Sequence, residues 1–342
     1  MRSAILVLLA LGIGPAQAAF VGFDIPGGGT QNGKGTYAYG INADGAVVGN
    51  VVDAHGTIAG YVRAPDGSVT TFRAAQAADT HAVDINADGV LTGYYVGGDG
   101  HNHGYTRAPD GTIATFDPKT SNGTQAIAIN VKGDVAGQFT DAKGAQRGFL
   151  DRQIGRTSEF DGGLAASFGT FVTAINATKE IVGFWFDDNS AMHGFDRARN
   201  GFLVPIEIDG AGSGALQGTQ PESINVHRDI AGFYTDAAGA RHGFLRKGDN
   251  GDVITFDVPG AKNTIVASVN RGRDIAGYYT DAGGAAHGFL RKPNGKIKTF
   301  DAPGAAIKPG AGTFVSRIND DGTIVGETYD AQFGSHGFVG TP

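Results

Sequence analysis

Five side chains of this sequence could together perform acid–base chemistry: His81, Tyr37, Tyr39, Glu222 and Arg317. His, Tyr and Glu can accept or donate a proton, and an Arg guanidinium can stabilise a negative charge that develops during a reaction. A base, an acid and a cation of this kind are what abstraction of a proton beside a carboxylate requires. One hypothesis is therefore an extracellular polysaccharide lyase or hydrolase with these catalytic residues.

Binding without catalysis is the interpretation that we prefer for these positions. Hydrogen bonds to a ligand could come from Tyr37, His81, Gln125 and Gln220, and Trp185, the only Trp, could stack on a sugar ring. An aromatic ring at a strand position also packs readily against a neighbouring sheet, which is the alternative for Trp185. We expect a binding or scaffold module with a carbohydrate or protein ligand.

The candidate residues belong to a cassette that recurs seven times along the chain. It consists of a Thr, then Ile-Asn or Val-Asn, then a Gly, and then Gly-Phe or Gly-Tyr. A repeat of roughly 40 to 50 residues made of short β-rich segments is typical of a β-propeller. We number the repeats 1 to 7 by their Asn residues: Asn42, Asn86, Asn130, Asn176, Asn225, Asn270 and Asn319.

Each repeat has the composition of four short strands, most clearly in repeat 6. Its segments are 264–270 (TIVASVN), 273–281 (RDIAGYYTD), 285–292 (AAHGFLRK) and 296–305 (KIKTFDAPGA). They are rich in Val, Ile, Tyr, Phe and Thr and are separated by residues that favour tight turns. The sequence therefore predicts an all-β fold: a seven-bladed β-propeller with four-stranded blades.

The loops that join the last strand of one repeat to the first strand of the next vary in length. From the end of the last strand to the next repeated Thr they run from 8 to 13 residues, whereas the spacing inside the cassette is constant. Binding residues tend to lie on variable loops held by a rigid scaffold, so we expect the working face there. The polar residues of the first strands that could converge at the mouth of the central channel are Tyr37, Tyr39, His81, Asp84, Gln125, Gln220, Glu222 and Arg317.

The two ends of the repeat array complement each other. Repeat 7 ends after His336 to Val339 without a fourth strand, while Phe20 to Ile25 matches the pattern of a fourth strand. We predict that this N-terminal strand completes blade 7 and closes the ring, which would remove the exposed sheet edges.

Residues 1–18 have the features of a secretory signal peptide. Arg2 precedes an apolar run that is too short to span a membrane, and Ala16-Gln17-Ala18 is a small-residue cleavage site. We therefore expect residues 19–342 to form a single propeller domain that is secreted or periplasmic.

Composition narrows the possible functions further. The net charge is −7 and the Lys and Arg residues are scattered, which disfavours nucleic acid as a partner. Cysteine is absent, which excludes disulfides and thiolate metal sites. We expect no cofactor, no bound metal, no membrane span and a monomer.

A His also recurs in the third segment of most repeats, at His103, His193, His242, His287 and His336. An Asp stands six residues before four of these His residues, so that the pair would face each other across a hairpin. A pair repeated around a ring cannot converge on one substrate. We therefore interpret these pairs as structural.

The Ile-Asn, Val-Gly and His-Gly-Phe-Leu-Arg landmarks of the repeat resemble those of the HAF family of bacterial extracellular repeats. That family is named for a His-Ala-Phe signature, and the middle residue here is Gly in every copy. The resemblance covers nearly all of the chain after residue 18. It implies an exported repeat protein, and it brings no established reaction or catalytic residues.

Overall fold

The computed structural model describes residues 19–74, 77–152, 156–163 and 169–342. These residues form strands and connecting loops and contain no helix, so no helix capable of crossing a membrane occurs among them. The expected signal peptide, residues 1–18, lies outside the described residues. The strands are β1 (Ala19–Phe23), β2 (Gly35–Ile41), β3 (Val47–Val52), β4 (Ile58–Arg63), β5 (Val69–Phe72), β6 (Thr80–Ile85), β7 (Leu91–Val96), β8 (Asn102–Arg107), β9 (Ile113–Phe116), β10 (Ser121–Ile129), β11 (Val135–Asp141), β12 (Gln146–Asp151), β13 (Thr157–Phe160), β14 (Thr170–Ile175), β15 (Ile181–Phe186), β16 (Met192–Arg197), β17 (Leu203–Ile206), β18 (Gly218–Ile224), β19 (Ile230–Thr235), β20 (Arg241–Arg246), β21 (Val253–Phe256), β22 (Asn263–Val269), β23 (Ile275–Thr280), β24 (Ala286–Arg291), β25 (Ile297–Phe300), β26 (Gly312–Ile318), β27 (Ile324–Tyr329) and β28 (Ser335–Thr341).

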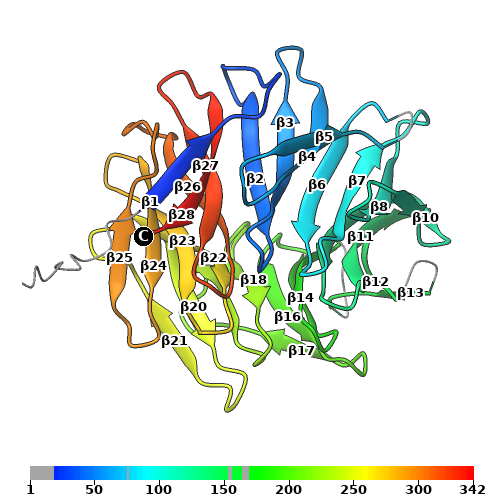
Figure 1. Ribbon diagram of the computed structural model, residues 1–342. Helices are drawn as coiled ribbons and strands as arrows, with labels where there is room; N and C mark the ends of the chain where they lie inside the picture. The colour runs from blue at the N-terminus through cyan, green and yellow to red at the C-terminus, as the bar shows by residue number, and fades with distance from the viewer. Residues whose placement is uncertain (1–18, 75–76, 153–155, 164–168) are drawn as a thin grey trace, which may run out of the picture.

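Strands within one repeat pair antiparallel in chain order. In repeat 1, for example, β2 pairs with β3, β3 with β4, and β4 with β5. The first strands of successive repeats contact one another from β2 through β6, β10, β14, β18 and β22 to β26, and β26 contacts β2. Figure 1 shows the resulting groups of strands arranged around the molecule in chain order.

The hydrogen-bonded sheets contain 12, 8, 4 and 4 strands and do not form one closed sheet. The two larger sheets arise because three long loops place the first strand of one repeat against the third strand of the repeat before it. The bridging pairs are Met192 with Gly218, Ala286 with Gly312, and Ser335 with Gly35. A Cβ atom on any of these three glycines would lie 2.0 to 2.1 Å from a backbone oxygen of the bridging partner, and φ is positive at each, so only Gly fits.

The seven repeated Asn residues form a continuous ring of hydrogen bonds. Each Nδ2 donates to the main-chain oxygen of the Asn in the next repeat at 3.0 to 3.3 Å, and Asn319 donates to Asn42. The Oδ1 atoms accept N–H groups of the turn that follows, as in Asn225 and Asp229. All seven side chains are buried, and these bonds explain why Asn recurs at this position.

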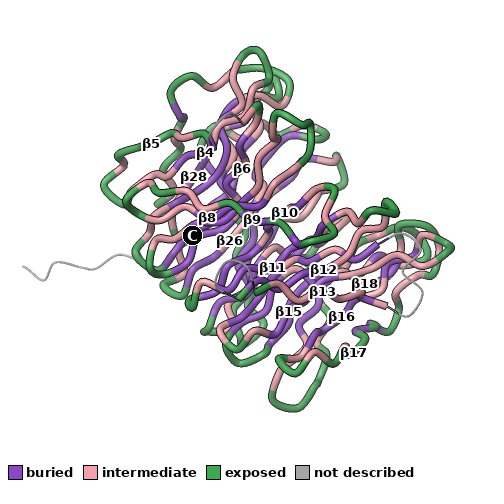
Figure 2. The backbone as a smooth tube through the Cα atoms, turned by 90° about the vertical axis from the view of Figure 1, so that its right-hand side faces the viewer, coloured by how far each residue is buried: buried purple, intermediate pink, exposed green. Residues whose placement is uncertain are grey.

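Apolar side chains fill the spaces between consecutive repeats. Figure 2 shows the buried residues in purple along the strands. The repeated aromatic of the third strand is at most 1% exposed in every copy: Tyr61, Tyr105, Phe149, Phe195, Phe244, Phe289 and Phe338. One core cluster joins Val325 of repeat 7 to Ile41 of repeat 1 and to Ile25. Burial between repeats therefore also joins the last repeat to the first.

The beginning and end of the described chain lie side by side. β1 pairs antiparallel with β28, as Figure 1 shows for the blue and red strands beside the C-terminus. The Phe20 ring stacks on Phe300 at 4.5 Å between centroids, and Asp24 lies 2.8 Å from Nδ1 of His336.

Candidate functional site

Two groups of polar residues occupy opposite ends of the first strands. Residues of all seven repeats line a central cavity of about 240 Å³ at the Asn ring, which we call the Asn-side cavity. At the other end, where the variable loops enter the first strands, two adjoining hollows of about 370 and 360 Å³ share Arg241, Ile265 and Tyr278. We call these two hollows the loop-side cavity; their remaining lining residues are Gln220, Glu222, Phe233, Gly239, Asn263, Val266, Ala267, Thr280, Phe314 and Ser316.

Arg317 and Asp84 line the Asn-side cavity and form an ion pair across it. Their Nη2 and Oδ1 atoms are 3.2 Å apart, and the other Asp84 oxygen accepts the backbone N–H of Ile129. The two residues belong to repeats 7 and 2, and a Cβ atom on Gly40 of repeat 1 would lie 3.3 Å from the Cα of Asp84. The charge of Arg317 is therefore already matched by Asp84.

His81 lies at the loop end of β6 in a neutral state. The Asn50 Oδ1 accepts the N–H of Ala82, which orients the amide so that its Nδ2 donates to His81 Nδ1 at 3.1 Å. The imidazole stacks on Tyr94 at 4.4 Å, and burial lowers the pKa of His81. The ring proton is therefore assigned to Nε2.

Tyr37 and Tyr39 lie near each other on β2, with their rings stacked at 6.1 Å between centroids. The Tyr37 hydroxyl donates to the Gly33 carbonyl of the preceding loop. Burial raises the pKa of both tyrosines, and the carboxylate of Glu327 raises them further. Both hydroxyl groups therefore keep their proton near neutral pH.

Glu222 lines the loop-side cavity, and its Oε1 accepts a hydrogen bond from Gln220 Nε2 at 2.6 Å. Burial raises the pKa of Glu222 to about 7, although Gln220, Arg317 and Arg241 favour the charged form. A carboxyl group with such a pKa exchanges a proton readily near neutral pH.

Glu327 is a second carboxyl of this kind, and the sequence analysis did not single it out. It lies opposite Phe314 on β27, and its Oε2 accepts a hydrogen bond from the Ser316 hydroxyl at 3.2 Å. Burial raises the pKa of Glu327 to about 7. It follows the repeated Gly of the second strand, a position that varies as much as the candidate positions of the first strand: Asn50, Tyr94, Gln138, Phe184, Phe233, Tyr278 and Glu327.

The structure does not bring all of the predicted site residues together. No hydrogen bond or ion pair joins His81 to Glu222, Tyr39 or Arg317, all of which the structure describes. Gln125 Oε1 accepts a hydrogen bond from Gln138 Nε2 at 3.1 Å, and Gln125 lines a separate hollow of about 170 Å³. Trp185 stacks on His193 at 4.5 Å and packs against a core cluster, away from the loop-side cavity.

The repeated His residues each lie between two carboxylates. Nδ1 is 2.8 to 2.9 Å from a carboxylate after the fourth strand, and Nε2 is 3.2 to 3.5 Å from one in the preceding hairpin. Sequence reasoning identified the hairpin Asp for four of these His residues but missed Asp99, which serves His103. It also missed the second carboxylates: Asp117, Glu207, Asp257, Asp301 and Asp24. Within the described ranges no cluster of His, Asp and Glu is arranged to hold a metal ion.

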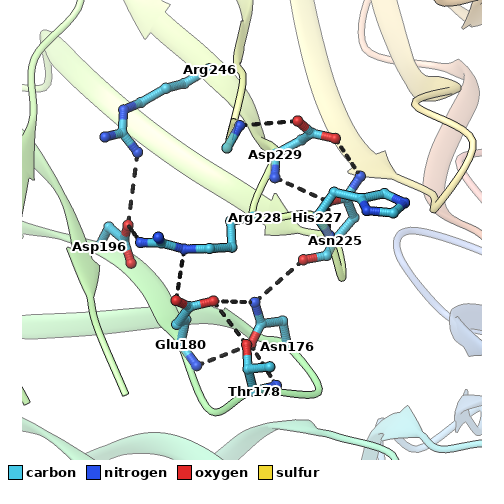
Figure 3. Close-up of polar contacts among 10 residues, drawn as sticks. Asn176, Thr178, Glu180, Asp196, Asn225, His227, Arg228, Asp229 and Arg246 are labelled. Carbon is cyan, nitrogen blue, oxygen red and sulfur yellow. Dashed lines mark hydrogen bonds and ion pairs between the residues drawn. The ribbon is translucent and has the colours of Figure 1, made fainter. Parts of the chain in front are cut away.

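Ion pairs join neighbouring repeats on the Asn side of the molecule. Figure 3 shows Arg228 Nε donating to Glu180, which in turn accepts a hydrogen bond from Asn176. Asp196, which is 1% exposed, lies 3.6 Å from Arg228 and 3.8 Å from Arg246. Analogous pairs join Lys179 to Asp134 at 3.1 Å and Arg273 to Asp229 at 2.8 Å.

No protein-family model and no curated protein matches this chain. Solved structures do match. The first is a streptogramin B lyase, with a TM-score of 0.62 and 13% identity over 94% of this chain and 98% of that one. The β-propeller domain of the Trilobed protease from Pyrococcus furiosus matches with a TM-score of 0.58 and 10% identity, covering 89% and 95%. A lectin from Burkholderia pseudomallei matches with a TM-score of 0.53 and 12% identity, covering 92% and 95%. The all-β fold predicted from the repeats is thus a β-propeller.

Proposed function

We propose that this protein is an exported β-propeller that binds a carbohydrate in the loop-side cavity. The observation that carries the proposal is the composition of that cavity. The rings of Tyr278 and Phe314 line it beside hydrogen-bonding groups of Gln220, Glu222 and Asn263. A sugar presents an apolar ring face and a rim of hydroxyls, so aromatic walls with polar groups between them are complementary to it. The lectin among the similar structures is consistent with this proposal but shows the fold alone.

The proposed architecture is a closed ring of seven four-stranded blades, with β1 as the fourth strand of blade 7. The pairing of β1 with β28 and the hydrogen bond from Asn319 to Asn42 support it. Deleting Phe20 to Ile25 should lower the melting temperature sharply, because it exposes Phe338 and opens a sheet edge. Replacing the exposed Val21 on the same strand by Ser is the control and should have little effect; an unchanged melt after the deletion would refute the closure.

Export is part of the proposal, with residues 1–18 as the signal peptide of an HAF-type repeat protein that is secreted or periplasmic. Expression of the full chain in a Gram-negative host should yield a product that begins at Ala19 outside the cytoplasm. A cytoplasmic product that retains Met1 would contradict export.

A second candidate function is cleavage of a polysaccharide at the same cavity. The observation that favours it is the pair of carboxyls, Glu222 and Glu327, with pKa values raised to about 7. Such groups can serve as general acids. Against it, the other predicted members of a catalytic set are engaged elsewhere, His81 by Asn50 and Arg317 by Asp84.

A glycan array probed with the mature protein, followed by analysis of each bound glycan for cleavage products, tests both functions. We expect binding without products, and Tyr278→Ala should weaken it at least about tenfold. Tyr279→Ala is the matched control, because that ring stacks on His287 away from the cavity. Products that disappear in Glu222→Gln or Glu327→Gln would establish the enzyme; absence of any glycan binding would redirect the search to protein ligands.

A further inference from the structure

The loop-side cavity holds the side chain of Arg241. Arg241 begins β20, is exposed, and lines both hollows of the cavity. Its guanidinium carbon lies 5.3 Å from the centre of the Phe233 ring, and its backbone N–H donates to Asn263. Among the residues that the structure describes, no carboxylate forms an ion pair with Arg241, in contrast to Arg228 and Arg273 on the Asn side.

The carboxyls around this cation do not present a full negative charge near neutral pH. Burial raises the pKa of Glu222 and of Glu327 to about 7, so below that pH each is largely a neutral hydrogen-bonding group. Gln220 already donates to Glu222, and Ser316 to Glu327. An anionic ligand would therefore meet the charge of Arg241 without strong repulsion from these neighbours.

The aromatic rings of Tyr278 and Phe314 line the cavity beside Arg241. The Tyr278 and Phe314 centroids are 5.0 Å apart with an angle of 60° between the ring planes, and Tyr329 lies 5.3 Å from Phe314. Asn263 lies at the same edge and donates to Thr280 at 2.9 Å. The cavity thus combines aromatic rings, groups that can bind sugar hydroxyls, and the Arg241 guanidinium, which no carboxylate of the described residues pairs.

We propose that the loop-side cavity selects a sugar that carries a carboxylate, such as a uronic acid, and that Arg241 determines this specificity. The planar guanidinium can donate two parallel hydrogen bonds to a carboxylate, while Tyr278 holds the sugar ring. This inference rests on the proposed carbohydrate-binding function and names the ligand class of that same site.

The test compares oligogalacturonate with the same oligosaccharide after its carboxylates have been reduced to primary alcohols. Wild-type protein should bind the acidic form at pH 6.5 about tenfold more tightly, as one charge-assisted interaction predicts. Arg241→Ala should remove this preference, so that the acidic and the reduced forms bind with equal affinity. Arg199→Ala, which removes another exposed Arg, is the matched control and should behave as wild type.

Different outcomes separate this inference from the proposed function. Equal affinity for the two forms, or a preference that survives Arg241→Ala, overturns the role of Arg241 while glycan binding stands. Tighter binding of a sulfated oligosaccharide than of either form overturns the carboxylate assignment. No binding of any oligosaccharide, with a normal melting profile, refutes the proposed function itself.

Discussion

The two sides of this propeller differ in how completely their polar groups are paired. On the Asn side, seven Asn side chains bond to one another in a ring, and Arg228 and Arg273 meet carboxylates of the preceding repeat. On the loop side, Arg241 has no ionic partner within the described part of the chain, and two carboxyls have raised pKa values. Arg228 and Arg273 on the Asn side thus contribute to the fold through ion pairs, whereas Arg241 on the loop side forms none with the residues that the structure describes. The repeated His residues form their own carboxylate pairs and line neither cavity.

The largest effect is expected from breaking the Asn ring. Asn225→Ala removes the hydrogen bonds from Nδ2 to Asn270 and Asp229, and it leaves the buried N–H of Asp229 and the N–H of His227 without their acceptor. It should lower the free energy of unfolding by about 3 kcal/mol, measured by denaturant titration. Gln220→Ala, at the loop end of the same strand, is the control and should cost less than about 1 kcal/mol.

An equal loss for Asn225→Ala and Gln220→Ala would mean that the two sides do not differ in their contribution to stability.

Glu327→Gln should stabilise the protein at alkaline pH. The folded-state pKa of Glu327 is raised from 4.5 to about 7, so the carboxyl costs stability as pH rises from its unfolded pKa through its folded one. At pH 8 the amide should gain about 2 kcal/mol over wild type, less than the full shift implies because the side chain is only partly enclosed. At pH 4 wild type and variant should have equal free energies of unfolding, and a gain that is the same at both pH values would contradict burial as the cause.

The Arg273 turn allows the ion pair and the backbone to be separated. Arg273 has φ of 64°, where repeats 1, 2, 3 and 7 have Gly, and it binds the buried Asp229. Arg273→Gly and Arg273→Ala both remove the cation, but only Gly adopts this φ without strain. The free energy of unfolding of the Ala variant should therefore be about 1 kcal/mol lower than that of the Gly variant, as measured by denaturant titration. Equal values would show that the turn relaxes at no cost.

The smallest effect per site is expected from the repeated His residues. The largest cause of the raised pKa of His103 is its hydrogen bond to Asp117. Burial lowers the pKa of His242 and His336, but the two carboxylates beside each outweigh it and raise the pKa. A raised His pKa gives stability that is complete below the unfolded value near 6.5 and is lost as pH rises through the folded value. Replacing His242 by Gln should flatten the decline of melting temperature between pH 6.5 and 8. An unchanged slope would show that these His–carboxylate pairs do not contribute to stability.

Much of the fold could be predicted from periodicity, because a residue such as the repeated Asn makes the same contact in each repeat. The strand-four pattern at Phe20 to Ile25 predicted a strand beside the third strand of repeat 7, and β1 (Ala19–Phe23) does pair with β28. The ring of hydrogen bonds among the Asn residues was not predicted. The parallel bridges at Gly35, Gly218 and Gly312 were not foreseen. They depend on backbone contacts of the long loops with a neighbouring hairpin, and a loop sequence rich in Gly and Ala does not encode its partner.

The candidate site was harder to predict, because its residues occur once each. The sequence analysis chose residues that depart from the repeat: Tyr37, Tyr39, His81, Glu222 and Arg317. That criterion shows neither which of the two cavities a side chain lines nor which residue pairs with its charge. Arg317 is paired with Asp84, while Arg241 and Glu327 line or approach the loop side from strands that were not considered. Applying the same criterion to the residue after the repeated Gly would have found Glu327 and Tyr278.

The central claim, that ligand binds on the loop side and not at the Asn ring, can be tested by hydrogen–deuterium exchange of residues 19–342 with and without the oligosaccharide that binds best. The account predicts slower exchange in segments that contain Arg241, Asn263 to Ile265, Tyr278 and Phe314, with no change in the turns after Asn42, Asn86 and Asn130. Protection confined to the turns of the Asn ring would contradict it.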